Sequence, residues 1–461
     1  MKRELPSILV AGVSSGCGKT LVTLGLMAAF RQMGVKVQPF KCGPDFIDPT
    51  LHSMVTGATS WNLDVKMCGP DYVRSLFFHE ALAGGINIIE GVMGLFDGGE
   101  ASAAALSGLL SVPVILVVDA SSAAESVAAV VKGFESMSRS TGGIQGVILN
   151  RIASPRHLRL IRDAVERNCL ARLAGYLPKD TAMEIPSRHL GLFMGGEKPL
   201  GMDISRLAST VRRHVNMEVI MDISRGCMGP ATRTPAFTEA SGIDGRKGPV
   251  DIGIARDRAF CFYYPDNLKI LECAGARLVP FSPSEDKGLP GGIGGLYLGG
   301  GYPELLAGTL SENRGMREDI RDFSRKGMPI LAECGGFMYL CRSITTMEGK
   351  RFDMAGVFPA DAVMQRRLSS LGYTKAVIKR RCCLGSPGDE LMGHEFHYSI
   401  TRFSGPVEHA YSLENGGKEG FLKDNTLAGY IHLHFGRTQE AASSFVQACR
   451  SAGQWRRRDG G

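Results

Sequence analysis

Several patterns that would assign the 461-residue chain to a simple class are missing from its sequence. None of the 12 cysteines belongs to a Cys-x-x-Cys pair, the spacing typical of structural zinc sites and redox centres. No apolar run reaches the roughly 18 residues of a membrane span, and the first apolar stretch is too short for a secretion signal. We therefore expect a cytoplasmic protein with no membrane partner, whose cysteines are mostly reduced thiols.

Long basic stripes with interleaved aromatic residues are missing as well, which argues against nucleic acid as a partner. The formal net charge is nevertheless +7. A mild positive field suits a polyanionic small molecule or ATP.

What the sequence does contain is a repeated alternation of short apolar strands and helices, which predicts an α/β fold with a parallel sheet covered on both faces. In the first half the expected strands lie at residues 7–12, 35–40, 86–89, 114–118 and 147–149. A second such pattern starts at residue 252, after a stretch rich in glycine and proline. We predict two α/β domains, residues 1–230 and 250–461, joined by a linker at 231–249.

Residues 12–20, Gly-Val-Ser-Ser-Gly-Cys-Gly-Lys-Thr, lie between a predicted strand and a predicted helix, the context of a phosphate-binding P-loop. The glycines let backbone N–H groups approach phosphate, and the helix N-terminus favours an anion. We expect Lys19 to reach the β- and γ-phosphates of ATP and the Thr20 hydroxyl to bind Mg²⁺. The predicted ATP-binding residues of the loop are Gly12, Ser15, Gly16, Gly18, Lys19 and Thr20.

Acidic residues follow two of the predicted strands, at the sheet edge where open α/β sheets bind ligands. Asp45 and Asp48 lie on the loop after the second strand, and Glu90 ends the third. Asp97 follows on a glycine-flanked loop. Thr20, Asp48 and Glu90 are the predicted Mg²⁺ ligands, and Asp45, Asp48 and Asp97 are the predicted catalytic carboxylates. Asp45 and Asp97 could instead cap turns, a common role beside glycine or proline.

In the second half, Ala-Glu-Cys-Gly-Gly at residues 332–336 places Cys334 on a sharp turn from strand to helix. A helix N-terminus beneath the thiol would lower its pKa and favour the thiolate. The N–H of Gly335, together with Gly300 and Gly301 on a second glycine loop, would form an oxyanion hole. The pattern is typical of a cysteine nucleophile.

A cysteine nucleophile needs a base, and His432 and His434 stand on a short apolar stretch that we expect to be one strand. Residues two apart on a strand point the same way, so either could face Cys334. His394 and His397 form a second polar cluster that could meet substrate. The four histidines could also be a zinc site.

Together these motifs resemble the cobyrinate a,c-diamide synthase family, and the resemblance covers nearly the whole chain. The long-spaced P-loop is similar to that of dethiobiotin synthetase. Further matching segments are residues 40–49, 90–98, 146–151, 186–192, 299–304, 332–336 and 393–399. The fold implied is a dethiobiotin synthetase-like P-loop domain followed by a class I glutamine amidotransferase-like α/β domain.

The resemblance implies a ligase that amidates the a and c carboxylates of cobyrinate, a corrin, with ATP, Mg²⁺ and L-glutamine. Glutamine would be hydrolysed at Cys334 through a thioester, and the carboxylates would be activated as acyl phosphates. The resemblance favours His432 over His434 as the base and places Asn150 near adenine. Relatives often follow the histidine with Pro-Glu, whereas Leu433-His434 follows here, so the third member of a triad is not visible.

Two rival interpretations stay open at this stage. Nickel sirohydrochlorin a,c-diamide synthases share these motifs, so the macrocycle is undecided. A P-loop regulatory switch with an inactive amidotransferase half is a rival of another class. The sequence also leaves open whether the chain forms a homodimer.

Overall fold

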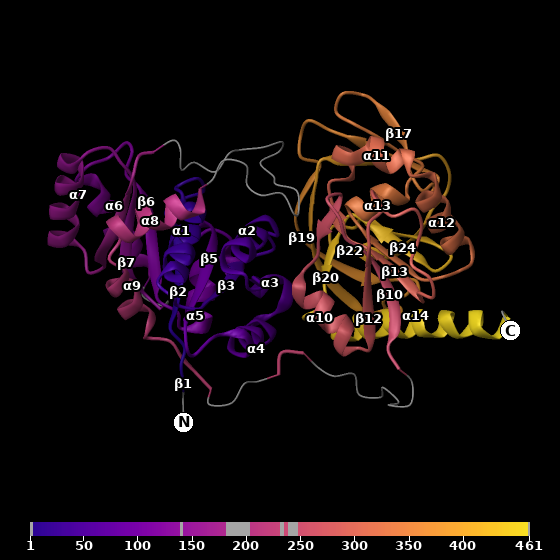
Figure 1. Ribbon diagram of the computed structural model, residues 1–461, viewed down its shortest axis with the longest axis horizontal. Helices are drawn as coiled ribbons and strands as arrows, with labels where there is room; N and C mark the ends of the chain where they lie inside the picture. The colour runs from indigo at the N-terminus through magenta and orange to yellow at the C-terminus, as the bar shows by residue number, and fades with distance from the viewer. Residues whose placement is uncertain (1–2, 139–141, 181–202, 231–234, 238–247, 460–461) are drawn as a thin grey trace. The chain divides into compact units, whose positions relative to one another are not determined.

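The computed structural model describes residues 3–138, 142–180, 203–230, 235–237 and 248–459 (Figure 1). The chain divides into two compact units, and among the described residues the division falls between Ala236 and Phe237. Of the predicted linker, residues 235–237, 248 and 249 are described, and the family segment at 186–192 lies outside the described residues.

The first unit is built on a seven-stranded sheet whose paired strands are all parallel, in the order β4-β3-β5-β2-β6-β7-β8. The central strand β2 is buried along its whole length, which fits a sheet covered on both faces. The strands are β2 (Ser7–Gly12), β3 (Val37–Cys42), β4 (Trp61–Leu63), β5 (Ile86–Gly94), β6 (Val114–Asp119), β7 (Ile144–Ile152) and β8 (Arg172–Pro178). β1 (Arg3–Glu4) pairs separately with β9 (Met228–Gly229).

Helix α1 (Lys19–Gln32) covers one face of this sheet and carries an unbroken buried run from Val22 to Phe30. It packs with β2, β5 and α8 in one apolar core. The remaining helices are α2 (Ile47–Thr56), α3 (Val65–Cys68), α4 (Pro70–Glu80), α5 (Ala103–Leu110), α6 (Ser126–Met137), α7 (Pro155–Asn168), α8 (Ile204–His214) and α9 (Met217–Ser224).

The second unit contains a ten-stranded mixed sheet in the order β12-β10-β13-β15-β24-β23-β22-β19-β20-β25. Its first five strands are parallel and the rest are antiparallel. They are β10 (Val250–Ala255), β12 (Ala276–Phe281), β13 (Gly295–Leu298), β15 (Ile330–Glu333), β19 (Ser370–Ile378), β20 (Glu390–His397), β22 (Glu408–Leu413), β23 (Lys418–Lys423), β24 (Thr426–Gly429) and β25 (His432–His434).

Smaller elements complete the second unit. β11 (Phe260–Phe262) pairs with β14 (Gly300–Gly301). A four-stranded sheet joins β17 (Arg351–Asp353), β16 (Ser343–Thr345), β18 (Ala360–Met364) and β21 (Ser399–Phe403). The helices are α10 (Pro265–Cys273), α11 (Ala307–Glu312), α12 (Arg314–Arg325), α13 (Gly335–Leu340) and α14 (Gln439–Asp459).

The α/β class and the parallel first sheet are confirmed, and two local expectations are wrong. Asp48 lies in the first turn of α2 rather than on a loop. β5 continues to Gly94, so Glu90 lies within the strand and not at its end. His432 and His434 both lie on β25, as expected for one short strand, and Tyr430 and Ile431 connect this strand to the preceding β24.

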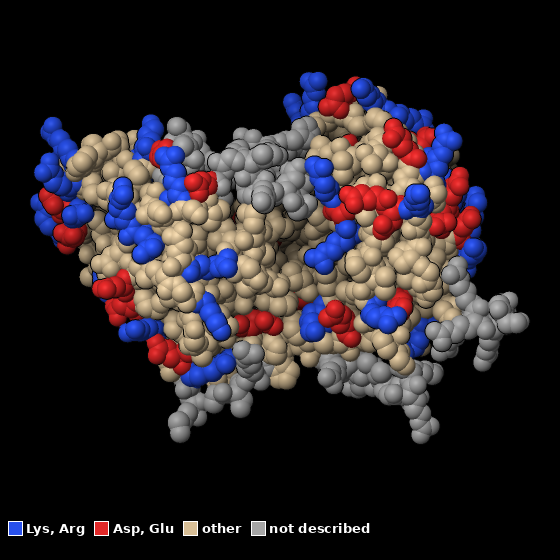
Figure 2. Space-filling view, in the orientation of Figure 1, with Lys and Arg blue, Asp and Glu red and all other residues tan. Residues whose placement is uncertain are grey.

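On the face in Figure 2, Lys and Arg side chains are interspersed with Asp and Glu on both units. Within the described part of the chain, no helix combines the length and the apolar character needed to cross a bilayer.

Candidate active sites

The P-loop lies at the end of β2 and its backbone turns at Gly18, where φ is +95° and α1 begins. A side chain at Gly18 would place its Cβ 2.0 Å from Asn150 Nδ2, so the loop requires glycine there. A cavity of about 330 Å³ opens at this point. Its lining is Gly16, Gly18, Lys19, Thr20, Leu21, Asn150, Arg151, Pro178, Lys179 and Asp180.

Asn150, two residues before the end of β7, is buried and contacts the loop. Its amide donates to the carbonyl of Cys17 at 3.0 Å and its oxygen accepts from the N–H of Arg151 at 2.9 Å. Arg151 has a positive φ of 60° and also contacts Asp119. Asn150 therefore holds the loop at the rim of the cavity.

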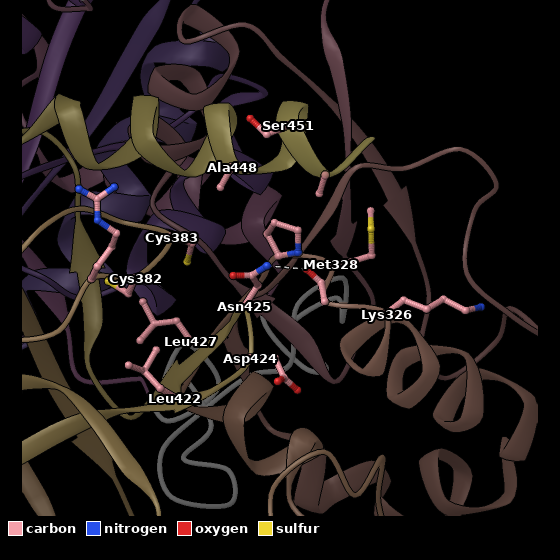
Figure 3. Close-up of a pocket in the computed structure, with 14 residues that line it drawn as sticks. Lys326, Met328, Cys382, Cys383, Leu422, Asp424, Asn425, Leu427, Ala448 and Ser451 are labelled. Carbon is pink, nitrogen blue, oxygen red and sulfur yellow. Dashed lines mark hydrogen bonds between the residues drawn. The ribbon is translucent and has the colours of Figure 1, made fainter. Parts of the chain in front are cut away.

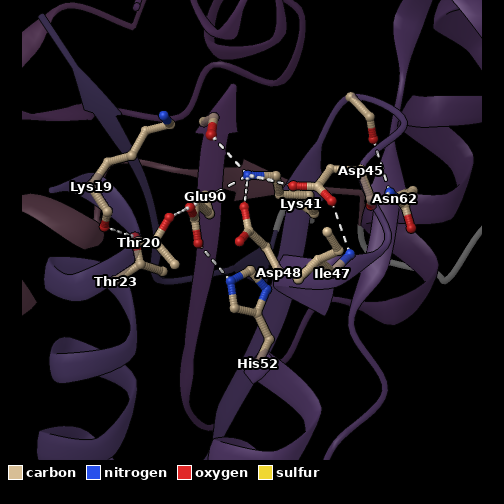
Figure 4. A network of polar contacts seen from close by, with 12 residues as sticks. Lys19, Thr20, Thr23, Lys41, Asp45, Ile47, Asp48, His52, Asn62 and Glu90 are labelled. Atoms are coloured by element: carbon tan, nitrogen blue, oxygen red, sulfur yellow. Dashed lines mark hydrogen bonds and ion pairs between the residues drawn. The ribbon is translucent and has the colours of Figure 1, made fainter. Parts of the chain in front are cut away.

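A buried polar network continues from the P-loop into the sheet (Figure 4). Thr20 Oγ1 donates to Glu90 Oε1 at 2.6 Å, and Glu90 Oε2 lies 2.7 Å from His52 Nε2. Lys41 Nζ lies 2.5 Å from Asp48 Oδ2 and 3.4 Å from Glu90 Oε1. The predicted residues Thr20, Glu90 and Asp48 thus belong to one network, with Lys41 at its centre.

The charge states in this network follow from burial and from the neighbours. Burial opposes the charge on Lys41, but Asp48, Glu90 and Asp45 outweigh it and raise its pKa. Burial likewise opposes ionisation of Asp48, but Lys41 and His52 hold its pKa below the usual range. Burial and the charge of Asp48 raise the pKa of Asp45, whose side chain is 34% exposed. Lys41 and Asp48 therefore form an ion pair.

Asp45 and Asp97 both make turn contacts. Asp45 Oδ1 accepts from the N–H of Ile47 at 2.8 Å, and its Oδ2 lies 4.0 Å from Lys41 Nζ. Asp97 Oδ2 accepts from the N–H of Gly94 at 2.9 Å. Within the described part of the chain this contact to Gly94 is the side-chain hydrogen bond of Asp97, and it matches the turn-capping role left open by the sequence.

The donor set beside the P-loop fits Mg²⁺. Thr20 lines the cavity, and its hydroxyl donates to the buried Glu90 carboxylate, so two hard oxygen groups lie next to each other beside the P-loop. Mg²⁺ needs only one or two such protein ligands besides phosphates and waters. Asp48 Oδ2 is already paired with Lys41 Nζ. Asp48 as a metal ligand stays a prediction.

Sequence reasoning missed Lys41 and His52. Lys41 is 2% exposed although it lies in the apolar strand β3, and His52 is fully buried on α2 with Ser60 at 3.0 Å. A lysine inside a buried strand was a usable signal, because a fully buried lysine requires paired anions. His52 carried no such signal, because its partner Glu90 is 38 residues away.

Cys334 stands between β15 and α13 with φ 47° and ψ −102°, a strained conformation for a non-glycine residue. Its N–H donates to the carbonyl of Gly429 at 2.7 Å. A Cβ at Gly335 would lie 3.0 Å from the N and O of Gly301, and one at Gly336 would lie 2.1 Å from the carbonyl oxygen of Leu298. The predicted sharp turn is present, and both following glycines are sterically required.

The second glycine loop lies between the cysteine turn and a histidine. Gly335 contacts Gly301, and a Cβ at Gly300 would lie 2.3 Å from His432 Cε1. The His432 ring also packs on Phe262, with ring centroids 4.0 Å apart. Three glycines, Gly335, Gly301 and Gly300, thus lie between Cys334 and His432.

The expectation of a lowered thiol pKa is wrong for this state of the protein. Cys334 is only 7% exposed, and burial raises its pKa. The charge of Glu304 adds to the increase, and the N–H of Gly335 offsets only part of it. Burial also lowers the pKa of His432, so its imidazole is neutral in the resting protein.

His434 has other partners. Its Nε2 lies 2.9 Å from Asp266 Oδ2, both side chains are fully buried, and its Nδ1 accepts from the N–H of Gly436 at 3.0 Å. Glu395 lies 3.7 Å from His397, whose ring stacks on Tyr430 at 3.8 Å.

His394 is the cross-strand neighbour of His432, and burial lowers its pKa to about 4. The zinc alternative finds no support, since the described part of the chain holds no group of three or more His, Cys, Asp or Glu side chains arranged for a metal.

A cavity of about 1040 Å³ lies elsewhere in the second unit (Figure 3). Arg381, Cys382, Cys383 and Asp424 are among its lining residues, and none of the predicted site residues is. Its size therefore does not indicate the reaction site.

Comparison with known proteins identifies both halves of the chain. Residues 8–193 match the family described as CobQ/CobB/MinD/ParA nucleotide binding domain, and residues 251–440 match the CobB/CobQ-like glutamine amidotransferase domain.

Three similar relatives are each named cobyrinate a,c-diamide synthase. The relative from Caldanaerobacter subterraneus is 40% identical over 97% of this chain and 99% of its own length. The relative from Syntrophotalea carbinolica is 42% identical over 96% and 99%, and that from Priestia megaterium is 39% identical over 98% of both chains. The chain therefore belongs to the cobyrinate a,c-diamide synthase family and is a glutamine-dependent, amide-forming ligase with a nucleotide-binding domain.

Proposed function

We propose that this protein converts the a and c carboxylates of cobyrinate to amides in cobalamin biosynthesis, using ATP and L-glutamine. One observation carries the proposal: the same chain contains two sites. In one, the P-loop is hydrogen-bonded to a buried carboxylate network, and in the other the turn at Cys334 packs on a glycine loop that also contacts His432. The names of the relatives support the choice of macrocycle.

The first unit would activate the carboxylate. A substrate carboxylate oxygen attacks the γ-phosphorus of ATP, ADP leaves, and an acyl phosphate forms, which ammonia then attacks with release of phosphate. Lys19 stabilises the charge that develops on the phosphates. Thr20 and Glu90 would hold Mg²⁺, which when bound neutralises phosphate charge. Asp45 and Asp48 would contact the metal or the substrate beside Lys41, and Asn150 would contact adenine.

The second unit would supply ammonia. The Cys334 thiol passes its proton to His432, and the sulfur attacks the amide carbon of glutamine while the N–H groups of Gly301 and Gly335 stabilise the oxyanion. Ammonia leaves, and water hydrolyses the thioester to glutamate. His432 is preferred over His434 because it adjoins Gly300, whereas His434 is paired with Asp266. Because burial raises the pKa of the resting thiol, we expect its proton to pass to His432 only when glutamine is bound.

We further propose that the boundary between the two catalytic domains lies within residues 231–249. A cytoplasmic location fits the 12 cysteines, all of which are free thiols.

Mass spectrometry of the product tests the substrate. The purified protein is given cobyrinate, or nickel sirohydrochlorin, with ATP, Mg²⁺ and glutamine. We expect conversion of two carboxylates of cobyrinate to amides. Turnover of the nickel compound with none of cobyrinate would refute the corrin assignment, and no amide from either would refute the proposed reaction.

A further inference from the structure

The glutaminase site has no carboxylate two residues after its histidine, because that position is His434. A different carboxyl group reaches the same short strand. Glu333, the residue immediately before Cys334, is only 3% exposed, and its Oε1 accepts from the N–H of Leu433 at 3.2 Å. Leu433 directly follows His432, so one side chain connects the segments that carry the nucleophile and the base.

The position of β25 makes this contact important. β25 ends the ten-stranded sheet and pairs with β20 on one side. The N–H of Leu433 is taken by Glu333, and its carbonyl accepts from Asn267 Nδ2 at 2.7 Å. Side chains therefore hydrogen-bond the backbone N–H and C=O of Leu433 on the open edge of β25, where a further strand would otherwise pair.

The surroundings of Glu333 contain no cation among its neighbours in the described structure. Tyr297 donates to its Oε2 at 3.0 Å. The titratable groups that face it are Tyr297 from β13, Tyr263 beside β11, Tyr411 from β22, Glu419 from β23 and Cys334. Burial in this setting raises the pKa of Glu333 to about 8, so the carboxyl is protonated at neutral pH. Its ionised form would raise the pKa of the neighbouring thiol.

We propose that Glu333 is the positioning residue of the glutaminase site. It connects β25, which carries His432, to the end of β15 directly before Cys334, and so takes the place of the missing third member of the triad. The proposal rests on the proposed roles of Cys334 and His432. It concerns alignment, so Glu333 itself does not touch glutamine.

Two substitutions test the alignment. Glu333→Gln keeps an acceptor for Leu433 and an amide that can donate to Tyr297, so glutamine-dependent activity should stay within about 10-fold of the unmodified enzyme. Glu333→Leu removes the acceptor, and a shift of His432 by about 1 Å should lower glutamine-dependent kcat by ~10²-fold. Amidation with free ammonia should be unchanged in both variants.

Ser324→Ala is the matched control, since it removes a buried hydrogen bond to Thr426 on β24, the strand next to β15. It should leave both nitrogen sources unaffected. A folded Glu333→Leu protein with normal glutamine-dependent kcat would overturn the proposal. So would an equal loss with glutamine and with ammonia, because that result indicates a general structural role.

The pH dependence provides a test that does not need the leucine variant to fold. The infrared spectrum of the unmodified enzyme minus that of Glu333→Gln should contain the C=O band of a protonated carboxyl, and this band should vanish as pH rises through about 8. Over the same pH range the glutaminase rate of Glu333→Gln divided by that of the unmodified enzyme should rise. Only the unmodified enzyme gains a negative charge at this position, and this charge raises the pKa of the Cys334 thiol. A flat ratio with no such band would show that Glu333 is neither buried nor close to the thiol, and this result would refute the position on which the proposal rests. If the unmodified enzyme releases no ammonia from glutamine, the proposed function itself fails, which is a distinguishable result.

Discussion

Substitution of Gly300 by alanine should impair glutamine hydrolysis but not amidation with free ammonia, because the His432 ring packs directly against this glycine. An added Cβ would lie 2.3 Å from His432 Cε1 and 3.1 Å from its Nδ1, whereas ordinary van der Waals contact begins at 3.4 Å. The imidazole must therefore move by about 1 Å or turn. A misplacement of this size in a catalytic group costs ~10²-fold in rate.

The assay compares glutamine-dependent amidation, ammonia-dependent amidation and ammonia release by Gly300→Ala. We expect the glutamine-dependent kcat to fall by ~10²-fold, or roughly 2.7 kcal/mol in activation free energy. The ammonia-dependent rate should stay unchanged, because the P-loop unit does not contain Gly300.

Gly405→Ala is the control, since an added Cβ there has no atom within 4 Å and its φ is not in the left-handed region. Its kinetics should match those of the unmodified enzyme. A Gly300→Ala enzyme with unchanged glutaminase activity would refute the assignment of His432 as the base.

Four further predictions follow from the same geometry. Cys334→Ala should abolish glutamine use and leave ammonia-dependent amidation intact; loss of both in a folded variant would refute the division of labour. Lys19→Ala should block amidation with either nitrogen source, measured as amide formed under saturating ammonia, and normal turnover would contradict the phosphate role. Lys41→Met should lower the free energy of unfolding by about 3 kcal/mol in denaturant titration, because it leaves Asp48 and Glu90 without their buried cation. Raising the pH from 4.5 to about 8 should lower the free energy of unfolding by on the order of a few kcal/mol through Glu333. The pKa of Glu333 is higher in the folded protein than in the unfolded chain, so between these pH values the unfolded chain has lost a proton that the folded protein still holds. Glu333→Gln should reduce that slope of stability against pH.

Local sequence was sufficient for features that depend on a few consecutive residues. The P-loop follows from glycines between a buried strand and a helix, and Gly18 and Lys19 lie where that pattern predicts. The turn at Cys334 follows from the glycines after it, which have no room for a side chain. The parallel sheet of the first unit followed from apolar strands alternating with helices.

Tertiary structure alone decided which distant side chains meet. His432 and His434 are equivalent by sequence spacing, but one packs on Gly300 and the other pairs with Asp266, because different distant segments lie beside the two positions of this three-residue edge strand. Lys41 and His52 belong to the site because each pairs with Glu90 on β5, far from both in the sequence. The thiol pKa was mispredicted because burial depends on the whole surrounding core, while the motif specifies only the turn. Sequence thus determined the turns that shape each site, and long-range packing determined their partners and charge states.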